Sequence, residues 1–173
     1  MFIIILNLMK NDFVHLHLHS QYSLLDGAIK FDELFDEVAR QGMSAVALTD
    51  HGNLFGAYDF YKLGKKNNIK PIIGCEVYIT KDRTKKTPEN NKTHHLTVLC
   101  MNIKGYENLC SLVSTGHLEG FYRKPRIDRE LLFEKSEGLI VLSGCLNSEV
   151  CHNILKGKKD EALRIASEYK NAL

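Results

Sequence analysis

Hydrophobic and polar positions alternate along residues 13–19, FVHLHLH, with the two-residue period typical of a β-strand. The pattern predicts a strand over about 13–18, with Val14, Leu16 and Leu18 on one face and the histidines on the other. Further along the chain, short apolar runs alternate with segments whose hydrophobic residues recur at helical spacing. The expected strands lie at about 13–18, 44–48, 69–79, 95–101 and 138–143, and the expected helices at about 30–41, 54–66, around 109–113, 127–135, 148–155 and 159–173.

This alternation of strands and helices predicts an α/β fold in which helices cover a parallel sheet. With five strands expected, both an open sheet and part of a (β/α) barrel remain possible. In barrels of this kind the chemistry lies at the carboxyl ends of the strands, and most polar candidates described below follow that rule. His95 does not follow it, because it begins its strand.

The composition is that of an ordinary globular protein, with 173 residues, 44% hydrophobic and 25% charged. This length is enough for one domain with a core. The net charge of +2 is too small to indicate nucleic-acid binding by itself. The five cysteines lack CxxC spacing and are interpreted as reduced thiols of a cytoplasmic protein. No apolar run reaches transmembrane length, so no membrane partner is expected.

Residues 1–9 form an apolar amino-terminal extension to which we assign no function. They make a poor signal peptide, because no basic residue precedes the apolar run and no small-residue cleavage site follows it. An upstream-start artefact and a short extra strand or tail are both compatible with the pattern. The remaining residues, 10–173, are expected to form one domain. The last helix has no Gly, Pro or polar stop after it, which predicts a fragment of a longer protein.

The three histidines of the first segment indicate a metal site, because three imidazoles on one strand face are costly to bury without partners. Neutral imidazole is a good ligand for Zn, Mn or Fe. Asp26 follows in the next loop, which favours the nearer pair, His17 and His19, as ligands. His15 is interpreted as lying below the site.

Four further residues that end or border predicted strands join this set: His51, Glu76, His95 and Cys145. Mixed nitrogen, oxygen and thiolate ligands suit zinc or manganese. Together with His17, His19 and Asp26 they exceed the four ligands of one tetrahedral zinc, which indicates at least two ions. Paired ions are typical of phosphoester hydrolysis. Asp50 is expected to orient its neighbours rather than bind metal.

A basic and aromatic loop, GFYRKPR, occupies residues 120–126. Arg123, Lys124 and Arg126 beside aromatic rings could hold a phosphate backbone and stack on bases of DNA. An ordinary solvated loop is an equally good interpretation.

Several blocks of the sequence carry a family resemblance. HLHLHSQYSLLDG, ALTDHGNLFGAYDFYK, IKPIIGCEVYI, HHLTVL, GYENL, EGFYRKPRIDRELL and EGLIVLSGCL occur in this order from about residue 10 onward. They resemble the amino-terminal polymerase and histidinol phosphatase (PHP) domain of bacterial replicative DNA polymerase III alpha subunits.

The resemblance implies a distorted (β/α) barrel of the PHP type, incomplete here, with five or so of its seven strands present. It implies two to three Zn or Mn ions in a complete domain and a metal-dependent 3′–5′ exonuclease. By motif, His17 and His19 match the HxH pair, Asp26 the following Asp-Gly, His51 the TDH histidine, Glu76 the bridging glutamate, His95 the strand histidine and Cys145 the Ser-Gly-Cys cysteine.

The family's closing Asp-x-His pair is missing from this chain, and so is the polymerase core with its Mg ions. In the whole replicase the resemblance implies DNA, sliding clamp, clamp loader and a proofreading exonuclease subunit as partners. Two alternatives stay open. One is a stand-alone PHP phosphatase acting on a small phosphate ester, and the other is a non-catalytic platform for a proofreading subunit.

Overall fold

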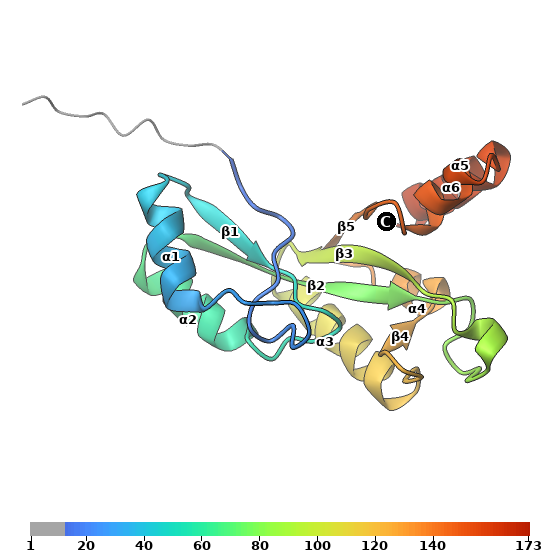
Figure 1. The fold of residues 1–173 in the computed structure, drawn as a ribbon, viewed down its shortest axis with the longest axis horizontal. Coiled ribbons are helices and arrows are strands. Elements are labelled where there is room, and N and C mark those ends of the chain that lie inside the picture. The colour runs from blue at the N-terminus through green and yellow to red at the C-terminus, as the bar shows by residue number, and fades with distance from the viewer. Residues whose placement is uncertain (1–12) are drawn as a thin grey trace, which may run out of the picture.

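The computed structural model describes residues 13–173 as a mixed α/β fold built on a five-stranded sheet (Figure 1). The expected extension at residues 1–9 lies outside the described residues. The strands follow the order β1-β2-β3-β5, and β4 pairs with β2 off this path. The elements are α1 (Phe31–Arg40), β1 (Ala45–Leu48), α2 (Ala57–Lys66), β2 (Lys70–Ile79), the 3₁₀ turn η1 (Pro88–Asn90), β3 (His94–Cys100), α3 (Ile103–Leu118), β4 (Arg126–Ile127), α4 (Arg129–Glu134), β5 (Leu139–Leu142), α5 (Glu149–Leu155) and α6 (Lys159–Ala172).

The sheet is mixed, so the expected all-parallel sheet is wrong. β1 and β4 pair with β2 in parallel, whereas β3 runs antiparallel to both β2 and β5. The β2–β3 connection explains the difference, because it contains no long helix that could carry the chain back across the sheet as a parallel crossover requires. The chain therefore turns back through residues 80–93, and the start of β3 lies beside the end of β2.

The first predicted strand is also wrong as a regular element. Residues 13–19 run beside β1 but form only an isolated bridge, between His15 and Val46. The main chain bends at His17, and Leu16 is 40% exposed whereas Leu18 is 8% exposed. The expected single apolar face is therefore absent from this segment. The sheet still has five strands, because the short strand β4 was not predicted.

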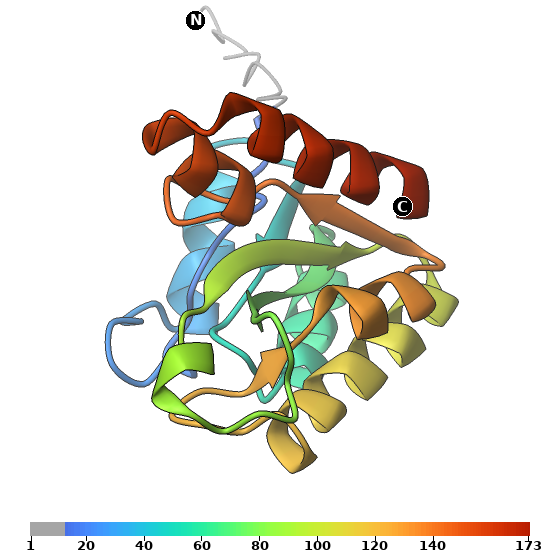
Figure 2. The same ribbon diagram turned by 90° about the vertical axis from the view of Figure 1, so that its right-hand side faces the viewer.

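Two apolar clusters hold the helices on the sheet. Phe31, Leu34, Phe35 and Val38 recur at helical spacing on α1 and pack against β1 and α2. The second cluster joins residues of β2, β3 and β5 to α3 and α4. Figure 2 shows α5 and α6 above the sheet in that view, and α3 and α4 below it. Within residues 13–173, no helix combines the length and apolarity needed to cross a membrane.

Candidate metal centre

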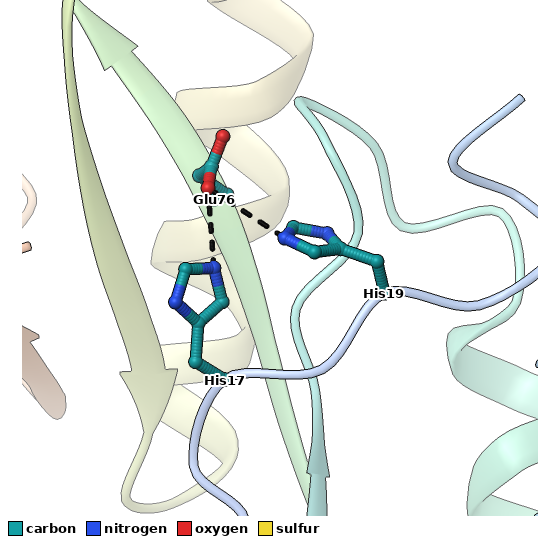
Figure 3. A group of neighbouring side chains, drawn as sticks. All are labelled: His17, His19 and Glu76. Atoms are coloured by element: carbon teal, nitrogen blue, oxygen red, sulfur yellow. Dashed lines mark hydrogen bonds and ion pairs between the residues drawn. The ribbon is translucent and has the colours of Figure 1, made fainter. Parts of the chain in front are cut away.

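Glu76 of β2 is the centre of the candidate site. Its side chain is only 4% exposed, and each carboxylate oxygen faces imidazoles. Oε2 lies 3.1 Å from His17 Nε2 and 3.7 Å from His19 Nε2. Figure 3 shows the two histidines, which come from the bent segment before α1, pointing toward the carboxylate on the sheet. The carboxylate is thus the point at which the amino-terminal segment meets β2.

The other oxygen of Glu76 faces two further histidines. Oε1 lies 2.8 Å from His51 Nδ1 and 4.0 Å from His95 Nδ1. Burial opposes ionisation of Glu76, but the hydrogen bond from His17 and the charges of His95 and His51 outweigh it and lower the pKa of Glu76 to about 2. A carboxylate held ionised among imidazole nitrogens is suited to bridging cations.

Asp26 and His19 complete this side of the centre around His51. Asp26 Oδ2 lies 3.1 Å from His51 Nε2, so His51 is placed between two carboxylates. The rings of His19 and His51 stack with centroids 3.9 Å apart. Burial first, and then the neighbouring His51, lower the pKa of His19, which favours the neutral ring that a metal requires. His15 instead packs its ring edge-on against Phe13.

His95 and Cys145 lie together at the start of β3. His95 Nε2 is 3.0 Å from Cys145 Sγ. The mixed sheet explains why His95 joins the centre although it begins its strand. Tyr78, near the end of β2, is the register partner of His95. Because β3 is antiparallel to β2, the start of β3 lies at the same end of the sheet as Glu76. β5 is antiparallel to β3 in turn, and its carboxyl end delivers Cys145 there.

Asp50 is buried and is hydrogen-bonded to the segment that carries His19 and Asp26. Its carboxylate accepts hydrogen bonds of 2.7 Å from the backbone N–H and hydroxyl of Ser20 and from the hydroxyl of Ser23. Ser23 Oγ in turn accepts a bond of 3.1 Å from the backbone N–H of His51. Asp50 therefore fixes both the turn between His19 and Asp26 and the start of the His51 segment.

Two glycines with positive φ allow the ligand-bearing turns. Gly144 has φ +76°, and a Cβ placed there would lie 2.7 Å from the carbonyl oxygen of His95. Gly52, directly after His51, has φ +61°, and its Cβ would lie 2.6 Å from the Pro125 ring. Both positions combine a left-handed backbone with close packing, which only glycine accepts without strain. The turn at Gly144 thereby brings Cys145 against the start of β3.

The structure contradicts the assignment of Arg126 to nucleic-acid binding. Arg126 is fully buried, and its guanidinium donates hydrogen bonds to the backbone carbonyls of Gly120, Asn90, Arg83 and Lys85. Its role is to tie the segment between β2 and β3 to β4. The five N–H donors of an arginine guanidinium are suited to several carbonyl acceptors at once. The sequence pattern alone does not reveal that these carbonyls gather around Arg126.

Arg123 and Lys124 are exposed, and Lys124 extends toward the centre. The Lys124 Nζ lies 4.2 Å from the centroid of the Tyr78 ring, and the ring of Tyr78 is stacked at 6.3 Å from that of His51. Burial first, and then the charge of Glu76, raise the pKa of Tyr78, so this tyrosine stays protonated beside the carboxylate. The ring of Tyr78 thus lies between the ammonium group of Lys124 and the candidate ligand His51.

Sequence reasoning missed three residues of the site: Tyr78, Ser20 and Ser23. Tyr78 follows Glu76 by two positions on a strand, so the period of two places both side chains on the same face. The two-residue spacing could therefore have identified Tyr78 as a residue of the site from the sequence. Ser20 and Ser23 lie in a turn, where hydroxyls commonly bond to local backbone, and their attachment to Asp50 depends on tertiary contact.

The donor set fits a divalent metal. Among the described residues, His17, His19 and Glu76 each offer a ligand atom, and these atoms lie within 4.8 Å of one another. His51, Asp26, His95 and Cys145 surround this group with further nitrogen, oxygen and sulfur donors. Imidazole, carboxylate and thiolate are ligands of zinc in proteins, and imidazole with carboxylate also suits manganese. The fold and this donor set together define an α/β protein with a histidine- and carboxylate-rich candidate metal centre.

Comparison with known proteins identifies the family of the chain. The PHP domain family matches residues 15–173, and the chain belongs to that family. The chain is 54% identical over 146 residues to the DNA polymerase III subunit alpha of Aquifex aeolicus, covering 80% of this chain and 13% of that protein. It is 47% identical over 168 residues to the same subunit of Helicobacter pylori strain J99, covering 91% of this chain and 14% of that protein.

The chain therefore spans about one seventh of the length of these relatives and is homologous to their amino-terminal region. A solved amidohydrolase of Chromobacterium violaceum with bound sulfate and no metal is 24% identical, with a TM-score of 0.44, and the likeness covers 59% of this chain and 32% of that one. The family assignment rests on the match over residues 15–173.

Proposed function

We propose that this chain is the PHP-domain part of a DNA polymerase III alpha subunit, and that its centre is a metal-dependent phosphoesterase acting as a 3′–5′ exonuclease on DNA. The observation that carries the proposal is the position of Glu76. A buried carboxylate with four imidazoles around it, and a thiol beside one of them, is a costly arrangement with little value unless cations occupy it.

The proposed ligands are His17, His19, Asp26, His51, Glu76, His95 and Cys145, holding two to three Zn or Mn ions. Such ions, when bound, make hydroxide available near neutral pH and stabilise charge on phosphoryl oxygens. Glu76 bridges the two halves of the donor set, because one of its oxygens faces His17 and the other faces His51. Asp50 positions the histidine segments through its serine contacts.

The exposed cations at the rim hold the substrate. Lys124 lies over Tyr78 at the edge of the centre, where its ammonium group can approach a phosphate bound at the ligands. Arg123 lies beside the Tyr122 ring, 5.8 Å from its centroid, and this pair can contact the sugar-phosphate backbone. Together these residues give the proposed site a preference for a polymeric phosphodiester over a small phosphate ester.

The activity of the whole protein is part of the proposal. The relatives are DNA polymerase III alpha subunits of about seven times this length. We infer that DNA synthesis, with its Mg ions, resides in the remainder of such a protein. DNA, sliding clamp, clamp loader and a proofreading exonuclease subunit are the proposed partners, and the cytoplasm is the proposed compartment.

A nuclease assay with matched variants tests the proposed activity. The chain, supplied with Zn or Mn, is incubated with single-stranded DNA labelled at its 3′ end, beside His17→Ala and Glu76→Gln. We expect release of the terminal nucleotide by the unmodified chain and loss of at least 100-fold of the rate in both variants. Equal rates in all three proteins would show a contaminating nuclease. Metal binding without cleavage would favour the non-catalytic platform, and cleavage of a small phosphate ester alone would favour the phosphatase.

A further inference from the structure

Four basic side chains gather beside the start of β3, outside the candidate metal centre. We call Lys92, His152, Lys156 and Lys158 the Lys92 cluster. Lys92 precedes β3, and the other three come from α5 and from the turn between α5 and α6. Lys92 Nζ donates to His152 Nε2 at 2.6 Å, which brings the two segments together. All three lysines are exposed.

The positive charge of this cluster is incompletely neutralised. Burial first, and then repulsion from Lys156 and Lys158, lower the pKa of Lys92, and Glu149 opposes that shift. Glu149 is itself engaged by Arg129 Nε at 3.8 Å and by the hydroxyl of Tyr169 at 3.3 Å.

Glu161 interacts electrostatically with Lys158, and Arg164 Nη2 holds its carboxylate at 2.7 Å. Glu149 and Glu161 are therefore both shared with other cations, and the surface keeps an affinity for anions.

A short turn connects the Lys92 cluster to the metal centre. The Nδ1 of His94 donates to the carbonyl of Asn147 at 2.7 Å, and the backbone N–H of Asn147 donates to Cys145 Sγ at 3.4 Å. The ring of His94 lies 5.3 Å from that of His152. Because adjacent residues of a strand point to opposite faces, His94 faces the cluster while His95 faces Glu76. The two sites therefore flank the first residues of β3.

We propose that the Lys92 cluster is a second binding surface, which holds the phosphate backbone of a single DNA strand whose reacting end lies at the metal centre. The inference rests on the proposed function, since that function supplies the reason for a polymeric phosphodiester to extend past Cys145. The chemistry fits, because ammonium groups bind phosphates as point charges without reading sequence. The Lys92 cluster also provides a contact to the phosphate backbone of DNA, which the buried Arg126 cannot make.

Binding measurements on the full chain test this surface. The affinity for 5′-labelled oligothymidylate is measured by fluorescence anisotropy against salt concentration, with EDTA present so that no cleavage occurs. The variant is Lys156→Ala/Lys158→Ala. The matched control is Lys65→Ala/Lys66→Ala, which removes two exposed lysines from the end of α2, at the start of β2 and away from the centre. Thermal unfolding establishes that both variants are folded.

Each lost phosphate contact makes the slope of log K against log salt concentration shallower by about 0.7 for single strands, so we expect a change of about 1.4 in the variant and none in the control. An unchanged slope in the variant, or an equal change in the control, would overturn the proposal. Polyglutamate that binds as tightly as the oligonucleotide, and is weakened equally by the variant, would also overturn it in favour of an acidic protein partner.

The proposed function has a separate readout. Hydrolysis of bis(p-nitrophenyl) phosphate by the unmodified chain with Mn reports on the metal centre, since this small diester has no phosphate backbone that could extend to the Lys92 cluster. Absence of that hydrolysis contradicts the proposed function, whereas the salt slope decides the binding surface independently.

Discussion

The sulfur of Cys145 lies 3.0 Å from Nε2 of His95, although 50 residues separate the two in the chain. The contact follows from the mixed sheet, since β3 begins at His94 and β5 ends at Leu142 on the same sheet end. It places a thiol among the nitrogen and oxygen donors around Glu76. We therefore propose that this sulfur is one of the ligands when the centre holds metal.

Replacement of Cys145 by serine should remove a spectroscopic signature. Co²⁺ takes the place of Zn²⁺ in nitrogen, oxygen and sulfur sites, and thiolate ligation gives a charge-transfer absorption in the near ultraviolet. We expect this band in the Co²⁺-loaded chain and its loss in Cys145→Ser. Cys151→Ser is the control, because Cys151 lies on α5 and is no proposed ligand. A band that persists in Cys145→Ser would exclude Cys145 as a ligand.

Gly144 and Gly157 form a matched pair for the turn that carries Cys145. Both have a similar positive φ, +76° and +72°, but a Cβ at Gly157 has nothing within 4 Å. Gly157→Ala should cost about 1–2 kcal/mol of the free energy of unfolding for the backbone alone. Gly144→Ala should cost more, since its Cβ also meets the His95 carbonyl, and it should weaken metal binding. Urea unfolding and metal titration measure the two effects, and equal behaviour of both variants would contradict this account of the turn.

Asp50→Asn should weaken the centre without removing a ligand. The amide retains one acceptor oxygen but turns an NH₂ group toward serine donors, so charge-assisted hydrogen bonds to Ser20 or Ser23 are lost. We expect a loss of about 1.5–3 kcal/mol in the free energy of unfolding. We also expect metal affinity to fall by about 10–100-fold, the usual effect of removing a group that orients metal ligands. Asp36→Asn on the exposed face of α1 is the control and should change neither. Unaltered metal affinity in Asp50→Asn would show that the serine contacts do not position the histidines.

Arg126 should behave as a structural residue. Arg126→Ala removes the side-chain donor from the Gly120 and Arg83 carbonyls, whereas the Asn90 and Lys85 carbonyls keep a second donor. It also empties a fully buried position, so it should destabilise the chain by about 3 kcal/mol or more in urea unfolding. Arg126→Lys keeps the charge but not the fork, so it should also destabilise the chain. Lys124→Ala should change stability by less than about 0.5 kcal/mol, because this side chain is exposed. A weaker affinity of Arg126→Ala for DNA at unchanged stability would restore the nucleic-acid assignment.

The sequence predicted the helices and most strands well because their signals are local. The apolar spacing of α1 and the short buried run of β1 each specify an element without reference to the rest of the chain. Strand direction is not encoded in this way, and the antiparallel entry of β3 was missed for that reason. The position of His95 at the start of its strand already indicated that β3 is antiparallel. The start of an antiparallel strand lies at the same end of the sheet as the carboxyl end of its neighbour.

The candidate ligands could be named from their motifs, but the relations between them could not. The alternation FVHLHLH predicts a straight strand, whereas the chain bends at His17 so that two imidazoles approach one carboxylate oxygen. The basic and aromatic pattern of residues 120–126 predicts a DNA-binding or solvated Arg126, and only the contacts with residues 80–93 reveal the carbonyl partners of its guanidinium. Tertiary contacts decide both cases.

The central claim is that Glu76 and the histidines around it bind metal, and the metal content of the purified chain tests it most directly. The chain, Glu76→Gln and Asp36→Asn are dialysed against trace Zn and Mn and analysed by inductively coupled plasma mass spectrometry. We predict at least one Zn or Mn ion for each chain in the unmodified protein and in Asp36→Asn, and a large loss in Glu76→Gln. A folded, unmodified chain that retains neither metal, or a Glu76→Gln variant that retains as much as the unmodified chain, would contradict the account.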